Sequence, residues 1–158
     1  MTEEQKSFMK MAIELSQMGM DSGIGGPFGC VIVKDGKVIG KGSNAVASTN
    51  DPTAHAEVVA IRDACKNLNS FQLEGCELYT SCEPCPMCLG AIYWARPSKV
   101  YYANTKTDAA KAGFDDQFIY EELELPHSER KIPFNQFMRQ EAIDVFDNWI
   151  NKENKTVY

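Results

Sequence analysis

His55-Ala56-Glu57 and, further along the chain, Pro84-Cys85-Pro86-Met87-Cys88 are the two stretches that decide how this sequence folds. Each stretch stands where a helix is expected to begin. Cysteines three residues apart at the start of a helix lie on one face, and the positive end of the helix dipole favours their thiolate forms. We therefore expect His55, Cys85 and Cys88 to bind one zinc ion. Three protein ligands leave the fourth position of a tetrahedral zinc site for water, which is typical of catalytic sites.

Glu57 moves the interpretation from metal binding to chemistry. A carboxylate two residues from a zinc-ligating histidine can reach the water on the metal without itself being a ligand. Residues two apart on a helix differ by roughly 200° in azimuth. The side chains of His55 and Glu57 therefore converge only if the zinc lies beyond the end of the helix. A first-turn glutamate also suits the helix dipole, so it is the combination with the cysteine pair that indicates an acid–base group.

Cys82 extends the cysteine pair to a C-x-x-C-x-x-C run and leaves two alternatives open. The run could supply three of four ligands of a structural zinc, or part of an iron–sulfur site. No cysteine follows three residues after Cys88, where a ferredoxin-type run has its fourth. No second C-x-x-C or H-x-x-x-H pair is present to complete a structural zinc site. The other histidine, His127, is expected in an exposed polar loop. The remaining cysteines are expected to be buried as small apolar residues: Cys30, Cys65 and Cys76.

Composition restricts the domain organisation and the kind of partner. With 158 residues, 44% of them hydrophobic and 24% charged, the chain is expected to form a single domain around one core. The net charge of -6 argues against a nucleic acid, because such binding requires clustered Lys and Arg. No stretch has the length needed to span a membrane. Residues 1–10 resemble no targeting peptide, so we expect a cytoplasmic protein whose thiols are reduced. The acidic net charge favours a small-molecule substrate.

Local signals predict alternating strands and helices. Thr2 and Gln5 form a capping box that opens a helix to about residue 20. Asp35-Gly36 predicts a hairpin between strands at 30–33 and 37–39. Asp51-Pro52 predicts the start of a second helix that ends at about residue 67. The other expected elements are a strand at 78–80, a helix from 84 to 94, a strand at 100–103, helices at 108–113, 116–123 and 140–152, and a polar connector at 126–133. Such alternation implies helices on both faces of a mixed sheet.

The order H-x-E followed by P-C-x-x-C matches the signature of zinc-dependent base deaminases. Over nearly its whole length the chain resembles the small bacterial guanine deaminases of the cytidine deaminase-like superfamily. The stretches that carry the resemblance are Gly25-Gly26-Pro27-Phe28-Gly29, Asn50 to Glu57, Thr80 to Pro97, and Ala112-Gly113-Phe114-Asp115-Asp116.

The resemblance implies an α/β protein with a three-layer α/β/α cytidine deaminase-like fold and a five-stranded mixed sheet. It also implies one Zn²⁺ per subunit and a homodimer. In that dimer the C-terminal segment, about residues 130–158, crosses to complete the site of the partner. The polar connector at 126–133 could serve as the hinge for this exchange.

The resemblance also assigns roles to individual side chains. Asn44 hydrogen-bonds the base, Phe28 contacts its face, and Asp116 acts near the leaving amine, with Asp115 as the alternative in register. Ala56, Trp94 and Tyr158 complete the substrate contacts, the last of them in the other subunit's pocket. A planar purine requires an aromatic or apolar wall and a few directed hydrogen bonds, which these residue types supply. Other readings are that Trp94 belongs to the core, that Asn44 bonds its own backbone, and that Asp116 caps a helix.

The reaction implied is the zinc-dependent hydrolytic deamination of guanine to xanthine and ammonia. Glu57 would move the protons and Asp116 would assist at the leaving amine. The same zinc machinery could deaminate guanosine, cytosine or adenosine in tRNA, because the core motif sets the chemistry and the pocket sets the base. The alternative from another class is a structural zinc module that binds a partner without catalysis.

Overall fold

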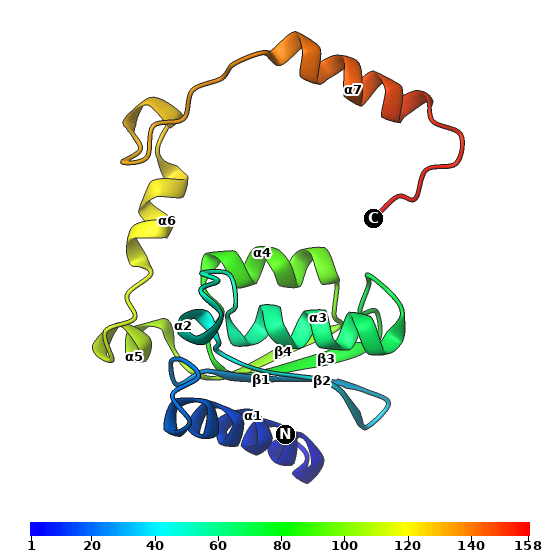
Figure 1. Cartoon of the computed structure of the whole chain (residues 1–158). Coiled ribbons are helices and arrows are strands. Elements are labelled where there is room, and N and C mark those ends of the chain that lie inside the picture. The colour runs from blue at the N-terminus through cyan, green and yellow to red at the C-terminus, as the bar shows by residue number, and fades with distance from the viewer. The chain divides into compact units, whose positions relative to one another are not determined.

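A four-stranded sheet with the strand order β2-β1-β3-β4 forms the centre of the fold (Figure 1). The structure is a computed structural model that describes residues 1–158 and divides into two units, residues 1–116 and 117–158. β1 (Gly29–Lys34) pairs antiparallel with both β2 (Lys37–Ser43) and β3 (Cys76–Cys82). β4 (Lys99–Asn104) pairs parallel with β3. The sheet is therefore mixed, as predicted.

The expected fifth strand is absent, and the prediction of a five-stranded sheet is wrong for this chain. β4 is an edge strand, and the chain enters helix α5 (Lys106–Lys111) immediately after it. Thr105 caps that helix, since its hydroxyl accepts from Asp108 N while the Asp108 carboxylate accepts from Thr105 N. Such a capping box starts a helix, so α5 confirms the helix predicted at 108–113, and the fifth strand implied by the resemblance is not formed.

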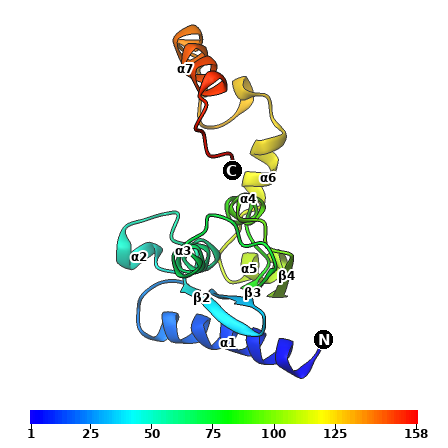
Figure 2. The ribbon, with the colours of Figure 1, turned by 90° about the vertical axis from the view of Figure 1, so that its right-hand side faces the viewer.

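Helices cover both faces of the sheet, which confirms the three-layer prediction. α1 (Glu3–Asp21) lies on one face, and α3 (Ala56–Leu68) and α4 (Pro86–Ala95) lie on the other (Figures 1 and 2). Strand residues alternate between the two faces. The α3 and α4 side buries Cys30, Ile32 and Leu78, and the α1 side buries Val31, Val33 and Tyr79.

The first helix and the first turn form where the sequence predicts them. The capping box of Thr2 and Gln5 is formed, and α1 begins at Glu3. Asp35 and Gly36 both have positive φ, 49° and 71°, as a two-residue hairpin turn of this kind requires. Cys30 and Cys76 are fully buried as expected, whereas Cys65 is only partly buried at the edge of the same cluster.

The second predicted helix begins later than expected. The Asp51 side chain accepts hydrogen bonds from Thr53 N at 2.8 Å and Thr53 Oγ1 at 2.7 Å, which closes a turn through Pro52. A side chain that bonds the backbone in this way competes with helix formation. The chain therefore forms the short helix α2 (Val46–Thr49), which was not predicted, then this turn, and α3 starts only at Ala56.

The second unit, residues 117–158, consists of α6 (Gln117–Glu124), a 3-10 turn η1 (His127–Glu129) and α7 (Arg139–Asn151). His127 is exposed, as predicted, and its ring stacks on Phe134. No residue of this unit is buried. None of the helices of the chain has both the length and the apolar character needed to cross a membrane.

The backbone of α3 lies directly on β2, at two glycines. A Cβ at Gly40 would be 2.6 Å from the Ala60 carbonyl oxygen, and a Cβ at Gly42 would be 2.6 Å from Ala60 N and would overlap the carbonyl oxygen of Ala56. Only residues without a side chain allow this approach. The first turn of α3 is thus held against the sheet by backbone contact.

We predict that Gly42→Ala lowers the free energy of unfolding by about 1–3 kcal/mol, because the added methyl group must displace α3. Gly90→Ala is the matched control: a Cβ at Gly90, an exposed position in α4, meets no atom within 4 Å. That substitution should instead stabilise by up to about 1 kcal/mol through helix propensity. Chemical denaturation measures both, and equal effects from the two substitutions would contradict the proposed backbone contact.

Candidate active site

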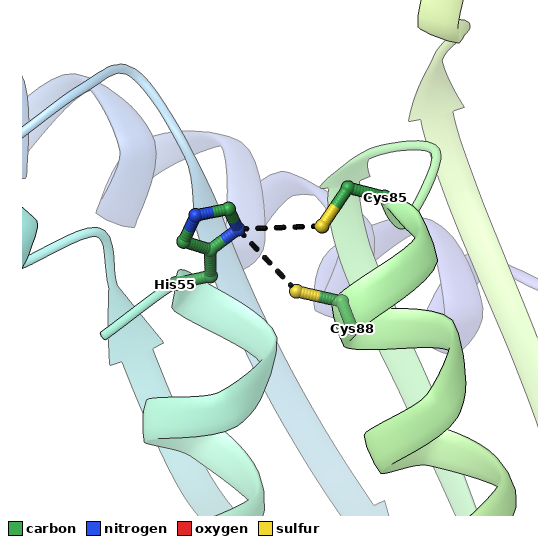
Figure 3. A group of neighbouring side chains, drawn as sticks. All are labelled: His55, Cys85 and Cys88. Carbon is green, nitrogen blue, oxygen red and sulfur yellow. Dashed lines mark hydrogen bonds between the residues drawn. The ribbon is translucent and has the colours of Figure 1, made fainter. Parts of the chain in front are cut away.

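Two helix N-termini and the end of one strand bring the predicted metal ligands together (Figure 3). His55 is the N-cap residue of α3, and Cys85 is the N-cap residue of α4. Both have extended backbone conformation, and neither side chain caps its own helix. Cys88 follows in the first turn of α4 and is fully buried. All three side chains can therefore reach a metal ion that lies beyond the helix ends.

The distances among the three ligand atoms fit a zinc ion. Nδ1 of His55 lies 3.5 Å from Sγ of Cys85 and 3.5 Å from Sγ of Cys88. A tetrahedral zinc with bonds of about 2.3 Å to sulfur and about 2.0–2.1 Å to nitrogen separates these atoms by roughly 3.5–3.6 Å. All three ligand atoms lie within 4.8 Å of one another. The set is the His/Cys/Cys combination of a zinc site with one open position.

The surroundings of Cys85 favour its thiolate, which is the form in which cysteine binds zinc. Hydrogen bonding from Cys88 and from His55 lowers the pKa of the Cys85 thiol to about 4. The interaction with Cys85 and burial raise the pKa of the Cys88 thiol. Both thiols lose their protons when a metal binds. Cys85 therefore offers a preformed thiolate.

Glu57 lies beside this ligand group without belonging to it. It is the second residue of α3 and is 6% exposed. Its Oε2 lies 3.4 Å from Cys88 Sγ, and its Oε1 accepts a hydrogen bond of 3.1 Å from Thr80 Oγ1. Burial raises the pKa of this carboxyl group. His55 precedes the first helical turn, so its side chain and that of Glu57 both reach the ligand group, as predicted for a metal beyond the helix end.

Cys82 does not join the ligand group. It is the last residue of β3, and its Sγ points to the carbonyl oxygen of Thr105 at 3.7 Å. Burial, together with the charge of Glu57, raises the pKa of its thiol to about 11, so it is neutral at physiological pH. The described chain holds one group of possible metal ligands of this kind, and it contains a single histidine and two cysteines. The geometry thus supports an open zinc site and speaks against a cluster ligated by all three cysteines of the run.

Asn44 and Phe28 lie on adjoining segments next to the sheet. Asn44 N donates to Phe28 O at 3.0 Å, and the buried Asn44 side chain accepts from the backbone N–H groups of Gly26 and Val46 through Oδ1, each at 3.3 Å. These bonds confirm that Asn44 serves the local backbone. They use its oxygen, so the NH₂ group is the end of the side chain left to donate to a ligand.

Ala56 and Asp116 also belong to the first unit. Ala56 is fully buried as the first residue of α3, between His55 and Glu57. Asp116 is partly buried, and burial, with a smaller contribution from the negative charge of Cys85, raises the pKa of its carboxyl group. Neighbouring Asp115 is exposed. Of the two neighbouring aspartates, Asp116 is thus the one whose carboxyl group is partly shielded from solvent.

Trp94 is not a core residue, and that alternative from the sequence is wrong. Its side chain is 65% exposed near the C-terminal end of α4. It lies six positions after Cys88, which is about 9 Å along a helix axis. Tyr158 ends the second unit and is 66% exposed. Within the first unit, α4 does not bring Trp94 to the ligand group.

Two residues beside the site had no role in the sequence analysis. Phe114 packs edge to face on Phe28, with 4.9 Å between ring centroids. Thr80, which donates to Glu57, lies on the same face of β3 as Leu78 and Cys82. The alternation of strand residues could have placed Thr80 on the site face. No sequence signal pairs Phe114 with Phe28.

The known proteins that resemble this chain share its zinc site. A family model described as the cytidine and deoxycytidylate deaminase zinc-binding region matches residues 2–104. The chain belongs to this zinc-binding deaminase family. All three metal ligands and Glu57 lie inside the matched segment. The His/Cys/Cys group is therefore the zinc site of a family member, and the fold is that of a cytidine deaminase.

Individual members of the family differ in how closely they resemble the chain. The guanine deaminase of Bacillus subtilis is 60% identical over 97% of this chain and 98% of its own length. An X-ray structure of guanine deaminase from Bacillus subtilis matches with a TM-score of 0.95 and 58% identity, over 100% of this chain and 99% of that one. A tRNA-specific adenosine deaminase of Aquifex aeolicus is 34% identical over 92% of this chain and 93% of its own length.

We predict that Cys85→Ser and Cys88→Ser each lose most of the bound zinc, whereas Cys82→Ser keeps it, because only the first two sulfurs lie near His55 Nδ1. Metal analysis of the purified proteins gives the zinc content per chain. Chelation should abolish activity while the far-ultraviolet circular dichroism changes little, because the ligands stand at the starts of helices that the core already holds. A Cys82→Ser protein as poor in zinc as Cys85→Ser would reinstate the alternative of a structural cluster.

Proposed function

We propose that this chain is a guanine deaminase that hydrolyses guanine to xanthine and ammonia. The observation that carries the choice of base is the similarity to the Bacillus subtilis enzyme, 60% identity over 97% of the chain, against 34% for the tRNA-specific adenosine deaminase. The net charge of -6 also disfavours tRNA, since RNA binding is built from clustered Lys and Arg.

The pocket residues suit a neutral purine. The Asn44 amide, oriented by Gly26 and Val46, offers a donor for an acceptor atom of the base. Phe28, supported edge-on by Phe114, offers an apolar ring against the face of a planar ligand. Ala56, which lies between His55 and Glu57 in the chain, remains a predicted substrate contact. Trp94 remains a predicted substrate contact.

Proton transfer in this reaction is assigned to Glu57. Zinc held by His55, Cys85 and Cys88 would supply a water polarised for attack on C2 of guanine. Glu57 takes the proton that this water gives up and delivers it to ring nitrogen N3. Glu57 or Asp116 then takes the proton of the hydroxyl group now on C2 and delivers it to the amino group, so that the C–N bond breaks, ammonia leaves and the carbonyl of xanthine forms. The raised pKa values of both carboxyl groups suit groups that must hold a proton during the cycle.

An ammonia-release panel of guanine, guanosine, cytosine and adenine tests the substrate. We expect guanine to give the highest kcat/KM. Glu57→Gln should keep its zinc, because Glu57 is not a ligand, yet lose at least about 10²-fold in kcat, the contribution typical of a general acid–base group. Turnover of another base in place of guanine would refute the substrate, and near wild-type activity of Glu57→Gln would refute the role of the carboxylate.

We also propose a homodimer in which the C-terminal segment, about residues 130–158, completes the site of the other subunit. In support, no residue of the second unit is buried, and α7 exposes large apolar side chains. These are Val145, Phe146, Trp149 and Ile150, which are 41–69% exposed. An isolated helix of this length is marginal in water, and such a surface normally packs on another surface. In the proposed dimer, Tyr158 of the partner subunit reaches the pocket.

A complementation experiment tests this exchange. We predict that deletion of Val157 and Tyr158 lowers kcat/KM by about tenfold or more, the scale of one lost contact to the base, with little change in the melting temperature. Refolding this truncated chain together with the inactive Glu57→Gln chain should restore activity, because a mixed dimer combines an intact Glu57 with an intact tail. A fully active truncated enzyme, or a mixture that stays inactive, would contradict the exchange.

We place the enzyme in the cytoplasm. All six cysteines are free, and two of them are required as thiolate ligands. A reducing compartment keeps such thiols available for zinc.

A further inference from the structure

The face of β3 that packs against α3 and α4 carries a hydroxyl group among apolar neighbours. Cys76 and Leu78 on this face belong to the apolar cluster beneath the two helices. Thr80 follows in the same alternation and pairs in register with Cys30, which is part of the same cluster. Thr80 is 1% exposed, so it is sealed from solvent and from any ligand.

The hydroxyl of Thr80 donates to the carboxylate assigned to proton transfer. The bond from Thr80 Oγ1 to Glu57 Oε1 is 3.1 Å long and buried. The second carboxylate oxygen, Oε2, lies 3.4 Å from Cys88 Sγ, on the metal side. A hydrogen bond to an ionised acceptor in a buried place is stronger than one between neutral groups. One oxygen of Glu57 is thus tied to the sheet while the other faces the ligand group.

We propose that Thr80 is a positioning residue for deamination, which holds Oε1 of Glu57 so that Oε2 is the oxygen presented to the water and the base. The inference rests on the proposed function for the identity of the reaction. A glutamate side chain has three rotatable bonds. The carboxylate of Glu57 also bonds its own backbone N–H and Cys88, but the Thr80 hydroxyl is the group that ties Oε1 to the sheet. Misplacement of a reacting group by about 1 Å can cost about 10²-fold in rate.

The threonine offers two substitutions that separate its hydroxyl from its packing. Thr80→Val keeps the shape and the β-branch but removes the hydroxyl. Thr80→Ser keeps the hydroxyl but removes a methyl group from the core. If Thr80 only fills space in the sheet, Thr80→Ser is the more damaging change. If it positions Glu57, Thr80→Val is the more damaging change for turnover.

Ser81 supplies a matched control on the same strand. It is 3% exposed, lies on the opposite face of β3, and accepts from Gly29 N at 3.0 Å. Ser81→Ala therefore also removes a buried hydroxyl and leaves a buried N–H unpaired, but it does not touch Glu57. This control should lower the melting temperature and leave kcat unchanged.

We expect Thr80→Val to lower kcat by about 10–100-fold with unchanged KM and zinc content, and Thr80→Ser to stay near wild type. The rates are measured on the base that the panel shows to be turned over fastest, so an error in the proposed substrate does not affect this test. Wild-type kcat in Thr80→Val, a loss in Thr80→Ser as large as in Thr80→Val, or a loss of zinc in Thr80→Val would each overturn the inference.

Crystal structures of the zinc-loaded variants give a readout that needs no substrate. The Glu57 carboxylate should keep its wild-type orientation in Thr80→Ser and rotate away from it, or occupy several orientations, in Thr80→Val. An unmoved carboxylate in Thr80→Val would overturn the positioning role even if the proposed reaction is correct. Failure of the ammonia panel would instead refute the reaction and leave this structural comparison as the test of Thr80.

Discussion

The approach of the α3 backbone to β2 at Gly40 and Gly42 is the constraint on which the active site depends. No side chain stands between helix and strand at these points, so the distance between them is set by backbone atoms. The first turn of α3, with His55 before it and Glu57 within it, takes its position from this contact. A helix packed through large side chains has several nearby arrangements, whereas backbone contact leaves one.

The second half of the site is anchored differently. Cys85 and Cys88 belong to the start of α4, which follows directly from the end of β3. Because β3 is a central strand, paired with β1 on one side and β4 on the other, its end is fixed from both directions. The metal ligands thus come from the start of α3, which packs directly on the sheet, and from the start of α4, which begins shortly after β3 ends. The zinc joins two elements whose places the core has already determined.

The metal site could be predicted from the sequence because His55-Ala56-Glu57 and Pro84-Cys85-Pro86-Met87-Cys88 together match the signature of zinc-dependent base deaminases. His55, Cys85 and Cys88 converge as expected, and the turn at Asp35-Gly36 forms because few residue pairs accept two positive φ angles. The start of α3 was misplaced because the bonds from Thr53 to Asp51 compete with the helix signal of Pro52. No motif indicates a role for Thr80, because its hydrogen bond to Glu57 forms only when β3 and α3 pack together.

The fifth strand and the position of Trp94 show a second kind of limit. Periodicity does not tell whether a surface is covered by the same chain or by another. The five-stranded sheet was implied by the resemblance alone, and no residue pattern had assigned the fifth strand; after β4 the chain enters the capped helix α5. Trp94 has an apolar side chain on an apolar helix, but α4 turns it outward.

The absence of a buried residue in 117–158 has a kinetic consequence. Residues 1–116 contain every zinc ligand and a core of their own, so folding and metal uptake by this part require a single chain. On the proposed dimer, the last segment finds its packing surface only when two chains meet, which is a second-order step. Dilution would therefore slow the maturation of the enzyme without slowing its metallation. A newly made chain would hold zinc before it holds a finished pocket.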